Sequence, residues 1–418
     1  MKILFISNMT PYKENYKGTS ALPYHMMLYR NSAWVKSELN LSGEDRIEIE
    51  IYSFNLNNLP SDKTKESEES LNVRIHILPI PQWFRIMTSL HILFLRLFLK
   101  YPLHYYLKLS KKYIDEIKAK NPDALWIYGE EMSNVSTKFP NIPKVHTTVD
   151  CTSLYYHRLL HSDVKLSLFQ KIKTYINFKK FFRLEKNYPM NNVKYHLVGE
   201  GDRDFLVNHA PNVNAFFIRH PHYEISSIMD AEGDCPPKNF NKPVKLLMAG
   251  QYNIYMRTDI DKIVSLLCNK YDNGIKRSVR NYTITFLGKG WEKHVTLLKT
   301  FGWDVCHKSF VEDYIGEIEK HDIQLTPIDI GTGTKGKVLD AIANGLLVIG
   351  SNYALENIAV ENRYSCLEYK KPSDVVNILK DISSNLSIYE NIAKCGQYNV
   401  LKFHGREVVA RDFFRLFM

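Results

Sequence analysis

The sequence lacks paired cysteines, long apolar runs and repetitive composition. Its six cysteines are scattered singly, without a C-x-x-C pair and without a histidine at metal-ligand spacing, so neither a disulfide framework nor a zinc motif is indicated. The apolar run within residues 1–8 is too short for the core of a signal peptide. No stretch is collagen-like or of low complexity. We therefore expect a globular cytosolic protein with reduced thiols.

Motifs for nucleic-acid binding are also missing. The chain has 55 Lys and Arg against 45 Asp and Glu, a net charge of +10, and such an excess favours anionic partners. These include nucleic acid, an anionic membrane and phosphorylated substrates. Zinc-finger spacing, RNP-type aromatic motifs and basic regions leading into heptads are all absent. We therefore expect no nucleic-acid partner.

What the chain does contain is a repeated alternation of short apolar runs and helix-length amphipathic segments. Its 418 residues exceed one ordinary hydrophobic core, which indicates two domains. Expected strands occupy residues 3–6, 47–51, 73–77, 124–128, 145–149, 195–198 and 216–218, and then 244–249, 282–287, 303–306, 323–326 and 346–350. This order predicts two successive α/β units with mainly parallel sheets.

The composition suggests where the domains divide. Residues 229–243 are rich in charge and proline and nearly free of apolar side chains, which is typical of a linker. We expect a first domain over 1–228, a second over 244–400, and a final segment, 401–418, that ends in an amphipathic helix.

The segment 323–351 carries the clearest chemistry. A buried strand leads into a loop with Gly331, Gly333 and Gly336, and a helix then runs from about Lys337 to Gly345. Glycines allow close approach of the backbone to a ligand, and a helix start offers unpaired N–H groups to a phosphate. Lys335 and Lys337 add positive charge, so the segment predicts a diphosphate site.

Asp340 lies one helical turn after Lys337 on the same face. An acid behind a phosphate site can accept hydrogen bonds from ribose hydroxyls. The alternative is a solvated helix whose glycines only make a turn. The strand-loop-helix-strand context with two lysines favours ligand binding.

The run G-T-G-T-K-G-K-V-L-D-A-I-A-N-G-L-L-V-I-G-S, residues 331–351, resembles the donor-site segment of family 4 glycosyltransferases. That resemblance implies the GT-B fold: α/β, with two Rossmann-like domains facing each other across a cleft and a C-terminal helix crossing back to the first. It also implies a nucleotide-sugar site that includes the turns at Gly250 and Gly288, with Phe310 and Val311 where family members hold the base. Thr334, between the loop glycines and Lys335, belongs to the same motif.

The resemblance further implies a retaining reaction in which Lys337 and backbone amides stabilise the leaving diphosphate in place of a metal. We therefore expect no cofactor and no metal, with the nucleoside-diphosphate sugar as co-substrate. One departure concerns the donor sugar: many family members carry a glutamate at the position of Thr332, and the chain has Asp340 at the second glutamate position.

Acceptor residues are expected in the first domain, beyond the carboxyl ends of its strands. Candidates are Gly18 and Thr19 in the early loop, and His146, Asp150 and Arg158 around a later strand end. Asp150 is the favoured catalytic candidate of this group. His146 could equally be a structural histidine.

Two basic, aromatic-rich segments, 83–113 and 165–186, belong to the first domain. Arg96 and Lys100 interrupt the apolar part of the first, so it is not a membrane span. It either contributes to the core or lies on an anionic membrane surface, and the lysines and aromatics of the second segment favour the membrane.

Taken together, the residues and the resemblance predict a hexosyltransferase acting in the assembly of a surface polysaccharide such as capsule or lipopolysaccharide, peripheral on the inner face of the cytoplasmic membrane. The acceptor would be a glycan or a lipid-linked glycan. Two alternatives stay open: a GT-B nucleotide-sugar epimerase, and a non-catalytic nucleotide-sugar-binding regulator.

Overall fold

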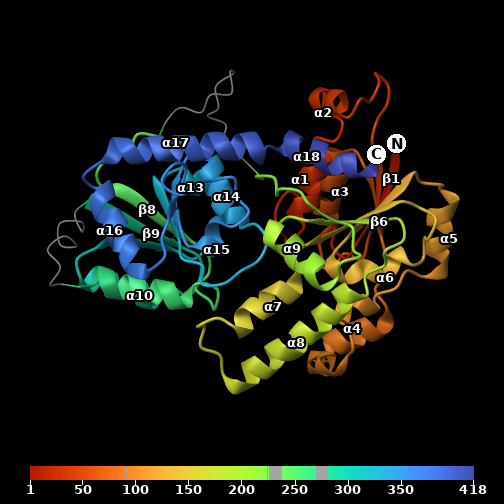
Figure 1. Cartoon of the computed structure of the whole chain (residues 1–418), viewed down its shortest axis with the longest axis horizontal. Helices are drawn as coiled ribbons and strands as arrows, with labels where there is room; N and C mark the ends of the chain where they lie inside the picture. The colour runs from red at the N-terminus through yellow and green to blue at the C-terminus, as the bar shows by residue number, and fades with distance from the viewer. Residues whose placement is uncertain (91, 224, 226–237, 270–280) are drawn as a thin grey trace. The chain divides into compact units, whose positions relative to one another are not determined.

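The computed structural model describes the chain except for residues 91, 224, 226–237 and 270–280. Two compact units are present (Figure 1). Unit 1 holds Met1–His161, Lys165–Tyr223 and Arg406–Met418, and unit 2 holds Ser162–Val164 and Glu224–Gly405. Most of the predicted linker, 229–243, lies outside the described residues.

Unit 1 is built on a parallel sheet of seven strands in the order β3-β2-β1-β4-β5-β6-β7. The strands are β1 (Lys2–Ser7), β2 (Glu48–Ser53), β3 (Arg74–Ile77), β4 (Ala124–Tyr128), β5 (Lys144–Val149), β6 (Val193–Leu197) and β7 (Ala215–Phe217). The central strands β1 and β4 are continuous apolar runs because helices cover both faces of a parallel sheet.

Helices connect these strands in unit 1. The α-helices are α1 (Ala21–Leu28), α2 (Ala33–Glu38), α3 (Ser61–Leu71), α4 (Gln82–Ser89), α5 (Lys111–Ala119), α6 (Ser133–Ser136), α7 (Thr152–Leu160), α8 (Leu168–Lys186), α9 (Glu200–His209) and α18 (Arg406–Phe414). Short 3₁₀ helices are η1 (Leu93–Phe98), η2 (Leu103–Tyr106), η3 (Glu130–Met132) and η5 (Arg415–Phe417). The segment 83–113 is therefore several short helical pieces, where the sequence suggested a helix interrupted at Pro102.

The last helix, α18, completes the core of unit 1. Phe413 is fully buried, and its ring centroid lies 4.4 Å from that of Trp126 in β4. Trp126 also meets Phe5 of β1 edge-on at 4.6 Å. Val409, Ala410 and Phe414 join the same cluster. The predicted C-terminal helix thus packs on unit 1, although it follows unit 2 in the chain.

Unit 2 contains a parallel sheet of six strands in the order β10-β9-β8-β11-β12-β13. Its strands are β8 (Val244–Ala249), β9 (Tyr282–Leu287), β10 (Asp304–Lys308), β11 (Ile323–Thr326), β12 (Leu347–Gly350) and β13 (Leu367–Glu368). Its helices are α10 (Arg257–Leu267), α12 (Glu292–Thr300), α13 (Tyr314–Ile318), α14 (Gly336–Ala343), α15 (Asn352–Leu355), α16 (Pro372–Ile382) and α17 (Leu386–Phe403).

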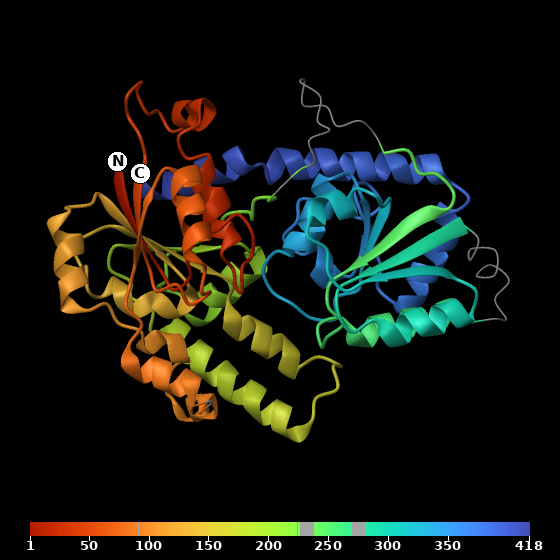
Figure 2. The same cartoon turned by 180° about the vertical axis from the view of Figure 1, so that it is seen from behind.

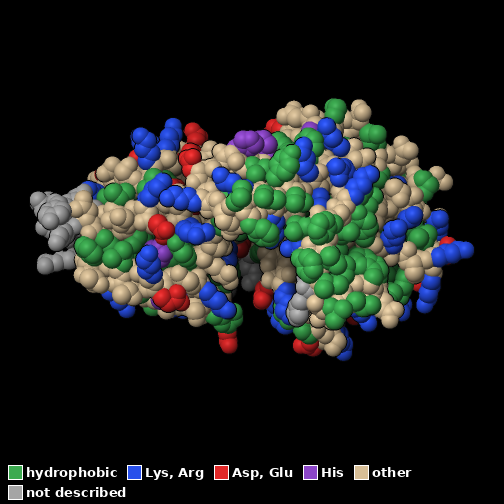
Figure 3. All heavy atoms as spheres, turned by 90° about the horizontal axis from the view of Figure 1, so that it is seen from below, with side chains coloured by type: hydrophobic (Ala, Val, Ile, Leu, Met, Phe, Trp, Pro, Cys, Tyr) green, Lys and Arg blue, Asp and Glu red, His purple; other side chains and the backbone are tan. Residues whose placement is uncertain are grey.

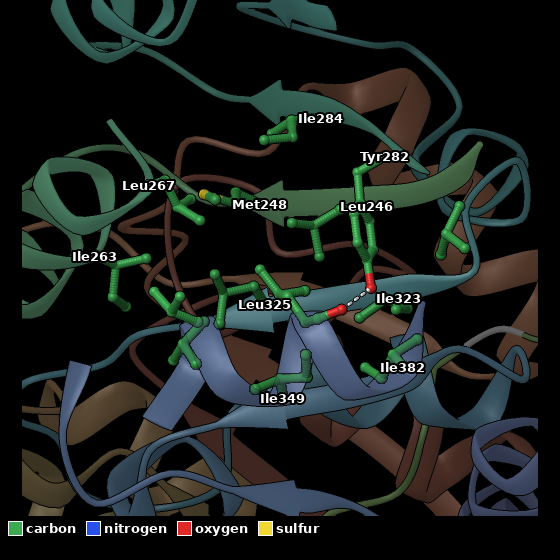
Figure 4. Packing of buried hydrophobic residues seen from close by; sticks show 14 of the residues in the cluster. Leu246, Met248, Ile263, Leu267, Tyr282, Ile284, Ile323, Leu325, Ile349 and Ile382 are labelled. Atoms are coloured by element: carbon green, nitrogen blue, oxygen red, sulfur yellow. Dashed lines mark hydrogen bonds between the residues drawn. The ribbon is translucent and has the colours of Figure 1, made fainter. Parts of the chain in front are cut away.

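The core of unit 2 lies between this sheet and its helices (Figure 4). Leu246, Ile284 and Leu325 come from three neighbouring strands, and Ile263 comes from α10. The buried Tyr282 keeps its hydroxyl satisfied by donating a 2.7 Å hydrogen bond to the carbonyl of Leu379 in α16. Each unit therefore has a hydrophobic core of its own.

Both sheets reverse their winding direction beside the first strand of the unit. In unit 1 the strand β1 lies between β2 and β4, and in unit 2 the strand β8 lies between β9 and β11. Such a reversal leaves a crevice outside the carboxyl ends of the two central strands, where ligands of open α/β sheets bind. The fold thus marks one candidate position in each unit.

Candidate functional site

Two glycine turns form the first part of the site in unit 2. Gly250 follows β8 with a φ of +139°, and Gly288 follows β9 with a φ of +128°. A Cβ on Gly288 would lie 2.2 Å from the carbonyl oxygen of Gly250, and that oxygen accepts a 2.8 Å hydrogen bond from the indole of Trp291. The two turns pack backbone against backbone, and only glycine fits there. The sequence-predicted Gly250 and Gly288 therefore lie together at the switch point.

The loop between β11 and α14 forms the second part. It is held from the neighbouring segments: the Ser351 hydroxyl donates to the carbonyl of Ile328 at 2.6 Å, and the Asn357 amide donates to that of Gly333 at 3.0 Å. The Asp329 carboxylate accepts from the backbone N–H groups of Thr258 and Asp259, at 2.6 and 2.9 Å, in the first turn of α10. Burial raises the pKa of Asp329 to about 6. The loop is thus preorganised.

Lys335 is directed toward its own loop. Its Nζ donates to the carbonyls of Thr332 and Gly333, the latter at 3.2 Å, and its Cε would lie 2.6 Å from a Cβ placed on Gly331. The sequence pattern predicted a cation for a phosphate at this position. In the structure the same charge lies against two carbonyls of its own loop. Thr334, beside it, is half-buried.

Lys337 occupies the first turn of α14. Its Nζ lies 5.2 Å from the centre of the Tyr314 ring, a cation–π distance. Residue 337 is exposed, yet surrounding protein atoms lower the pKa of Lys337 by desolvation, and the charge of the buried Asp340 opposes that shift. Lys337 and Asp340 therefore interact on one face of α14, as their spacing predicted.

Two residues near this helix carried no recognisable signal in the sequence. The Tyr314 hydroxyl is buried and has no hydrogen-bond partner within the described part of the chain, and burial with the nearby Asp340 raises the pKa of Tyr314. Gln324, buried in β11, donates to Thr326 Oγ1 at 3.0 Å and to the carbonyl of Lys337 at 3.4 Å. Both residues contact Lys337 in the first turn of α14 and help to fix its position.

Phe310 and Val311 lie between β10 and α13. The Phe310 side chain is 76% exposed, whereas Val311 is partly buried against the second core cluster of unit 2. An exposed aromatic ring close to the carboxyl edge of a sheet is available for stacking.

In unit 1, the early loop lies at the switch point. The Tyr128 hydroxyl, at the end of β4, donates a 2.7 Å hydrogen bond to the carbonyl of Thr19. Gly18 packs against the thioether of Met9. The charge of Asp150 acts on the same Tyr128 and contributes, after burial, to its raised pKa. The predicted residues Gly18, Thr19 and Asp150 thus surround the end of β4.

Asp150 follows a strained position. Val149, the last residue of β5, has a φ of +71°, and the pairing of β5 with β6 shifts register between Thr147 and Val149. A β-branched residue rarely adopts this conformation, and such strain gathers at functional sites. Arg158 lies in α7, the helix that follows Asp150, and is half-buried.

Buried carboxylates hold the segment after Asp150. Asp202 accepts from the backbone N–H of Cys151 at 2.9 Å, and Glu185 accepts from that of Ser153 at 3.0 Å. Glu130, the first residue of η3 after β4, is also buried, and burial followed by the charge of Glu185 raises the pKa of Glu130 well above its usual value. These carboxylates position the start of α7.

His146 is placed differently from the expectation of sugar contact. It lies within β5 and is fully buried, with Nε2 donating to the Gly129 carbonyl at 2.9 Å. Burial lowers the pKa of His146 to about 4, so its ring is neutral at physiological pH. This arrangement favours the structural interpretation of His146.

No protein-family model and no curated protein matches the sequence. Solved structures resemble the fold over nearly the whole chain. HepE of Anabaena in complex with UDP and glucose shares 11% identity, with 99% of this chain and 98% of that one aligned at a TM-score of 0.60. A glycosyltransferase of Rickettsia africae shares 11% identity, with 100% of this chain and 97% of that one aligned at a TM-score of 0.60. The lipopolysaccharide outer core galactosyltransferase WaaB shares 12% identity, with 100% of this chain and 99% of that one aligned at a TM-score of 0.58.

The chain has the GT-B fold. The α/β class, with a mainly parallel sheet in each of two units, is thereby confirmed. Within the described residues, no group of three or more His, Cys, Asp and Glu side chains could hold a metal ion, and no helix is long and apolar enough to cross a membrane.

Proposed function

We propose that the protein is a retaining glycosyltransferase that moves a sugar from a nucleoside-diphosphate sugar to a glycan or lipid-linked acceptor in surface polysaccharide assembly. The observation that supports this most directly is the placement of the preorganised loop 327–335 and the start of α14 at the switch point of a Rossmann-order sheet, where Gly250 and Gly288 also lie. HepE, which shares the fold, has been solved with UDP-glucose.

In this proposal the diphosphate binds at the first turn of α14. The N–H groups at a helix start have no partners within the helix and face an anion with the positive end of the dipole. Lys337 adds a cation whose position is supported by the Tyr314 ring and Asp340. As the sugar–phosphate bond breaks, negative charge grows on the leaving diphosphate, and these groups stabilise it without a metal. Asp340 would accept a hydrogen bond from a ribose hydroxyl, and Phe310 would stack on the base.

The acceptor in this proposal binds to unit 1 around the end of β4. Asp150, set by the strained Val149 and the buried carboxylates, is the group proposed to face the reacting sugar, with Gly18, Thr19 and Arg158 near the acceptor. We also propose that the protein works at the inner face of the cytoplasmic membrane, where a lipid-linked acceptor would be available.

A thermal-shift assay against UDP, GDP, CMP and their sugar conjugates, without added metal, tests the donor site. A ligand that binds only the folded protein raises its melting temperature. We expect one nucleoside diphosphate to stabilise the protein and Lys337→Ala to abolish that shift, while Lys299→Ala on α12 leaves it unchanged. No response to any nucleotide would contradict the proposal.

A nucleotide-sugar-binding regulator without catalysis is the second candidate. Thr332 stands where many members of the family that the donor-site segment resembles carry a glutamate for the donor sugar, and this departure favours the regulator. Product analysis separates the candidates: transfer to an acceptor supports the enzyme, whereas binding without turnover over a panel of acceptors supports the regulator. An isomerised donor formed without acceptor would instead identify an epimerase.

A further inference from the structure

Exposed apolar side chains are concentrated on one part of unit 1. Of 22 large apolar residues that are exposed in the described part of the chain, ten fall within residues 83–98 and 168–175. They are Trp83, Ile86, Leu90, Phe94, Leu95, Phe98, Leu168, Phe169, Ile172 and Tyr175. Phe98 is 83% exposed and Leu168 is 76% exposed. Exposed apolar side chains concentrated in this way mark an interaction site.

The two segments lie side by side although some 70 residues separate them in the sequence. Lys180 of α8 is buried and donates from Nζ to the carbonyl of Arg96 in η1. Arg183 donates to the carbonyl of Lys100 at 3.2 Å. Residues 83–100 and 165–186 therefore form one surface, here called the basic apolar face. Figure 3 shows hydrophobic side chains gathered there with Lys and Arg among them.

Helix α8 serves two purposes along its length. Its second half is packed by aromatic contacts: Phe178 on His157 and Phe181 on Tyr156, both in α7, and Phe182 on His209 in α9. Figures 1 and 2 both show α7 and α8 together. These contacts account for the aromatic residues of the second half within the protein itself.

The first half of α8 is exposed yet well defined. Ser167 and Gln170 form a reciprocal capping box, so the helix start does not depend on packing. Leu168, Ile172 and Tyr175 follow the i, i+4, i+7 spacing of one helical face, and Lys179 Nζ lies 5.4 Å from the Tyr175 ring. Within the described residues of unit 1, these three side chains stay exposed to solvent.

Charge limits what can cover the basic apolar face. Its 40 residues contain ten Lys and Arg and a single acidic residue, Glu185, which is buried. Nearly all of the net charge of +10 is therefore concentrated there. A second copy of the same face would bring like charges together. A nucleic acid would match the charge but would leave the exposed Leu and Ile side chains without apolar contacts. An anionic lipid surface matches both the charge and the apolar side chains.

The geometry points to the basic apolar face as a docking surface for an anionic bilayer. Lys171, Lys179, Arg85 and Lys100 meet the phosphate headgroups, while Phe98, Leu168 and their neighbours enter the boundary between headgroups and acyl chains. The side chains Trp83 and Tyr175 suit this boundary because they combine an apolar ring with a polar group. The inference deepens the membrane location given under the proposed function, and it does not depend on the donor site.

Flotation with lipid vesicles tests whether the basic apolar face binds an anionic bilayer. The full chain is mixed, without nucleotide, with vesicles of phosphatidylcholine alone or with added phosphatidylglycerol. We expect flotation only with the anionic vesicles, and it should fall as salt rises. Each lysine near an anionic surface contributes about 1 kcal/mol, so K171A/K179A should bind about 30-fold more weakly. L168S/F169S should also lose binding, whereas L297S/I388S, matched changes on exposed residues of unit 2, should not.

Circular dichroism melting verifies that each variant is folded. Absence of flotation for the folded wild-type protein at low salt would overturn the inference, as would equal flotation of all four proteins. A dimer that light scattering detects and that L168S/F169S dissociates, without any flotation, would instead identify a second copy as the occupant. Because nucleotide binding is measured separately by thermal shift, failure of the membrane surface and failure of the donor site remain distinguishable.

Discussion

The two switch points of this molecule are built by different means. In unit 2 the switch point is bordered by backbone: the turns at Gly250 and Gly288, the loop 327–335 and the start of α14. In unit 1 it is bordered by side chains, with Asp150 after the strained Val149 and with Glu130, Glu185 and Asp202 buried behind it.

This difference follows from what each position is proposed to bind. A diphosphate is recognised by N–H groups and close backbone approach, which require glycines at fixed positions and so leave a visible pattern in the sequence. An acceptor is recognised by side chains whose orientation depends on partners far away in the chain. The predictions below test whether the two switch points are independent, beginning with the largest expected effect.

Phe413→Ala should destabilise unit 1 and leave unit 2 intact. The ring is fully buried against Trp126, and truncation of a buried Phe costs about 3–5 kcal/mol. Hydrogen exchange followed by mass spectrometry should show lost protection in strands β1 and β4 with little change in β8 and β11. Phe403→Ala, at an exposed position of α17, is the control. Equal loss of protection in both units would show that the cores are not independent.

Lys337→Ala should remove most turnover. The expected loss of transition-state stabilisation is about 2.7–4 kcal/mol, as for a lost oxyanion-hole donor. It should appear as a reduction of about 100-fold to 1000-fold in kcat with an unchanged circular dichroism spectrum. Lys299→Ala controls for a general charge effect. Full activity of a folded Lys337→Ala protein would remove α14 from the proposed mechanism.

Asp150→Asn should separate the two switch points most directly. We expect turnover to fall about 100-fold, which is the lower end of the contribution that a general acid or base makes to catalysis. Stabilisation by the nucleoside diphosphate in a thermal-shift assay should remain, because the donor position belongs to unit 2. If the variant lost nucleotide binding instead, Asp150 would have to act on the donor.

Glu130→Gln should have the smallest effect, and that effect should depend on pH. The folded-state pKa of Glu130 is raised, so the folded protein holds a proton that the unfolded chain releases. This group therefore favours folding below the ordinary glutamate pKa, and its contribution is lost as pH rises through the raised folded value.

Glutamine mimics the protonated acid at every pH. Urea unfolding at several pH values should therefore show a smaller loss of stability with rising pH in Glu130→Gln than in the wild type. Glu292→Gln, an exposed position in α12, is the matched control and should follow the wild-type pH dependence. A steeper loss in Glu130→Gln would mean that the carboxylate is charged in the folded state.

Much of the fold could be predicted because the central strands of both parallel sheets are buried and mostly apolar. Residues 124–128, 244–249 and 323–326 are strands at the predicted bounds. The two-residue strand β13 was not predicted, since Leu367–Glu368 is too short to form a pattern. The segment 83–113 was harder, because its apolar residues face solvent and its helical pieces are short.

Several contacts of the candidate residues could not be predicted from the sequence. His146 was considered for sugar contact because it lies near the end of a strand, but it is buried within β5. The role of Glu130 at the start of α7 was not predicted, because Glu130 and Glu185 are far apart in the sequence and come close only in the folded chain. In unit 2, Lys335 was expected to face a phosphate, and its contacts with Thr332 and Gly333 depend on the path of the loop.

The sequence by itself determined the two α/β units, the glycine-rich loop before α14 and the helical face shared by Lys337 and Asp340, because these follow from local periodicity and spacing. Only the tertiary structure decided which buried carboxylates support Asp150, how α18 enters the core of unit 1, and that residues 83–100 and 165–186 form one surface. Those features depend on contacts between residues far apart in the chain, and no local pattern encodes such contacts.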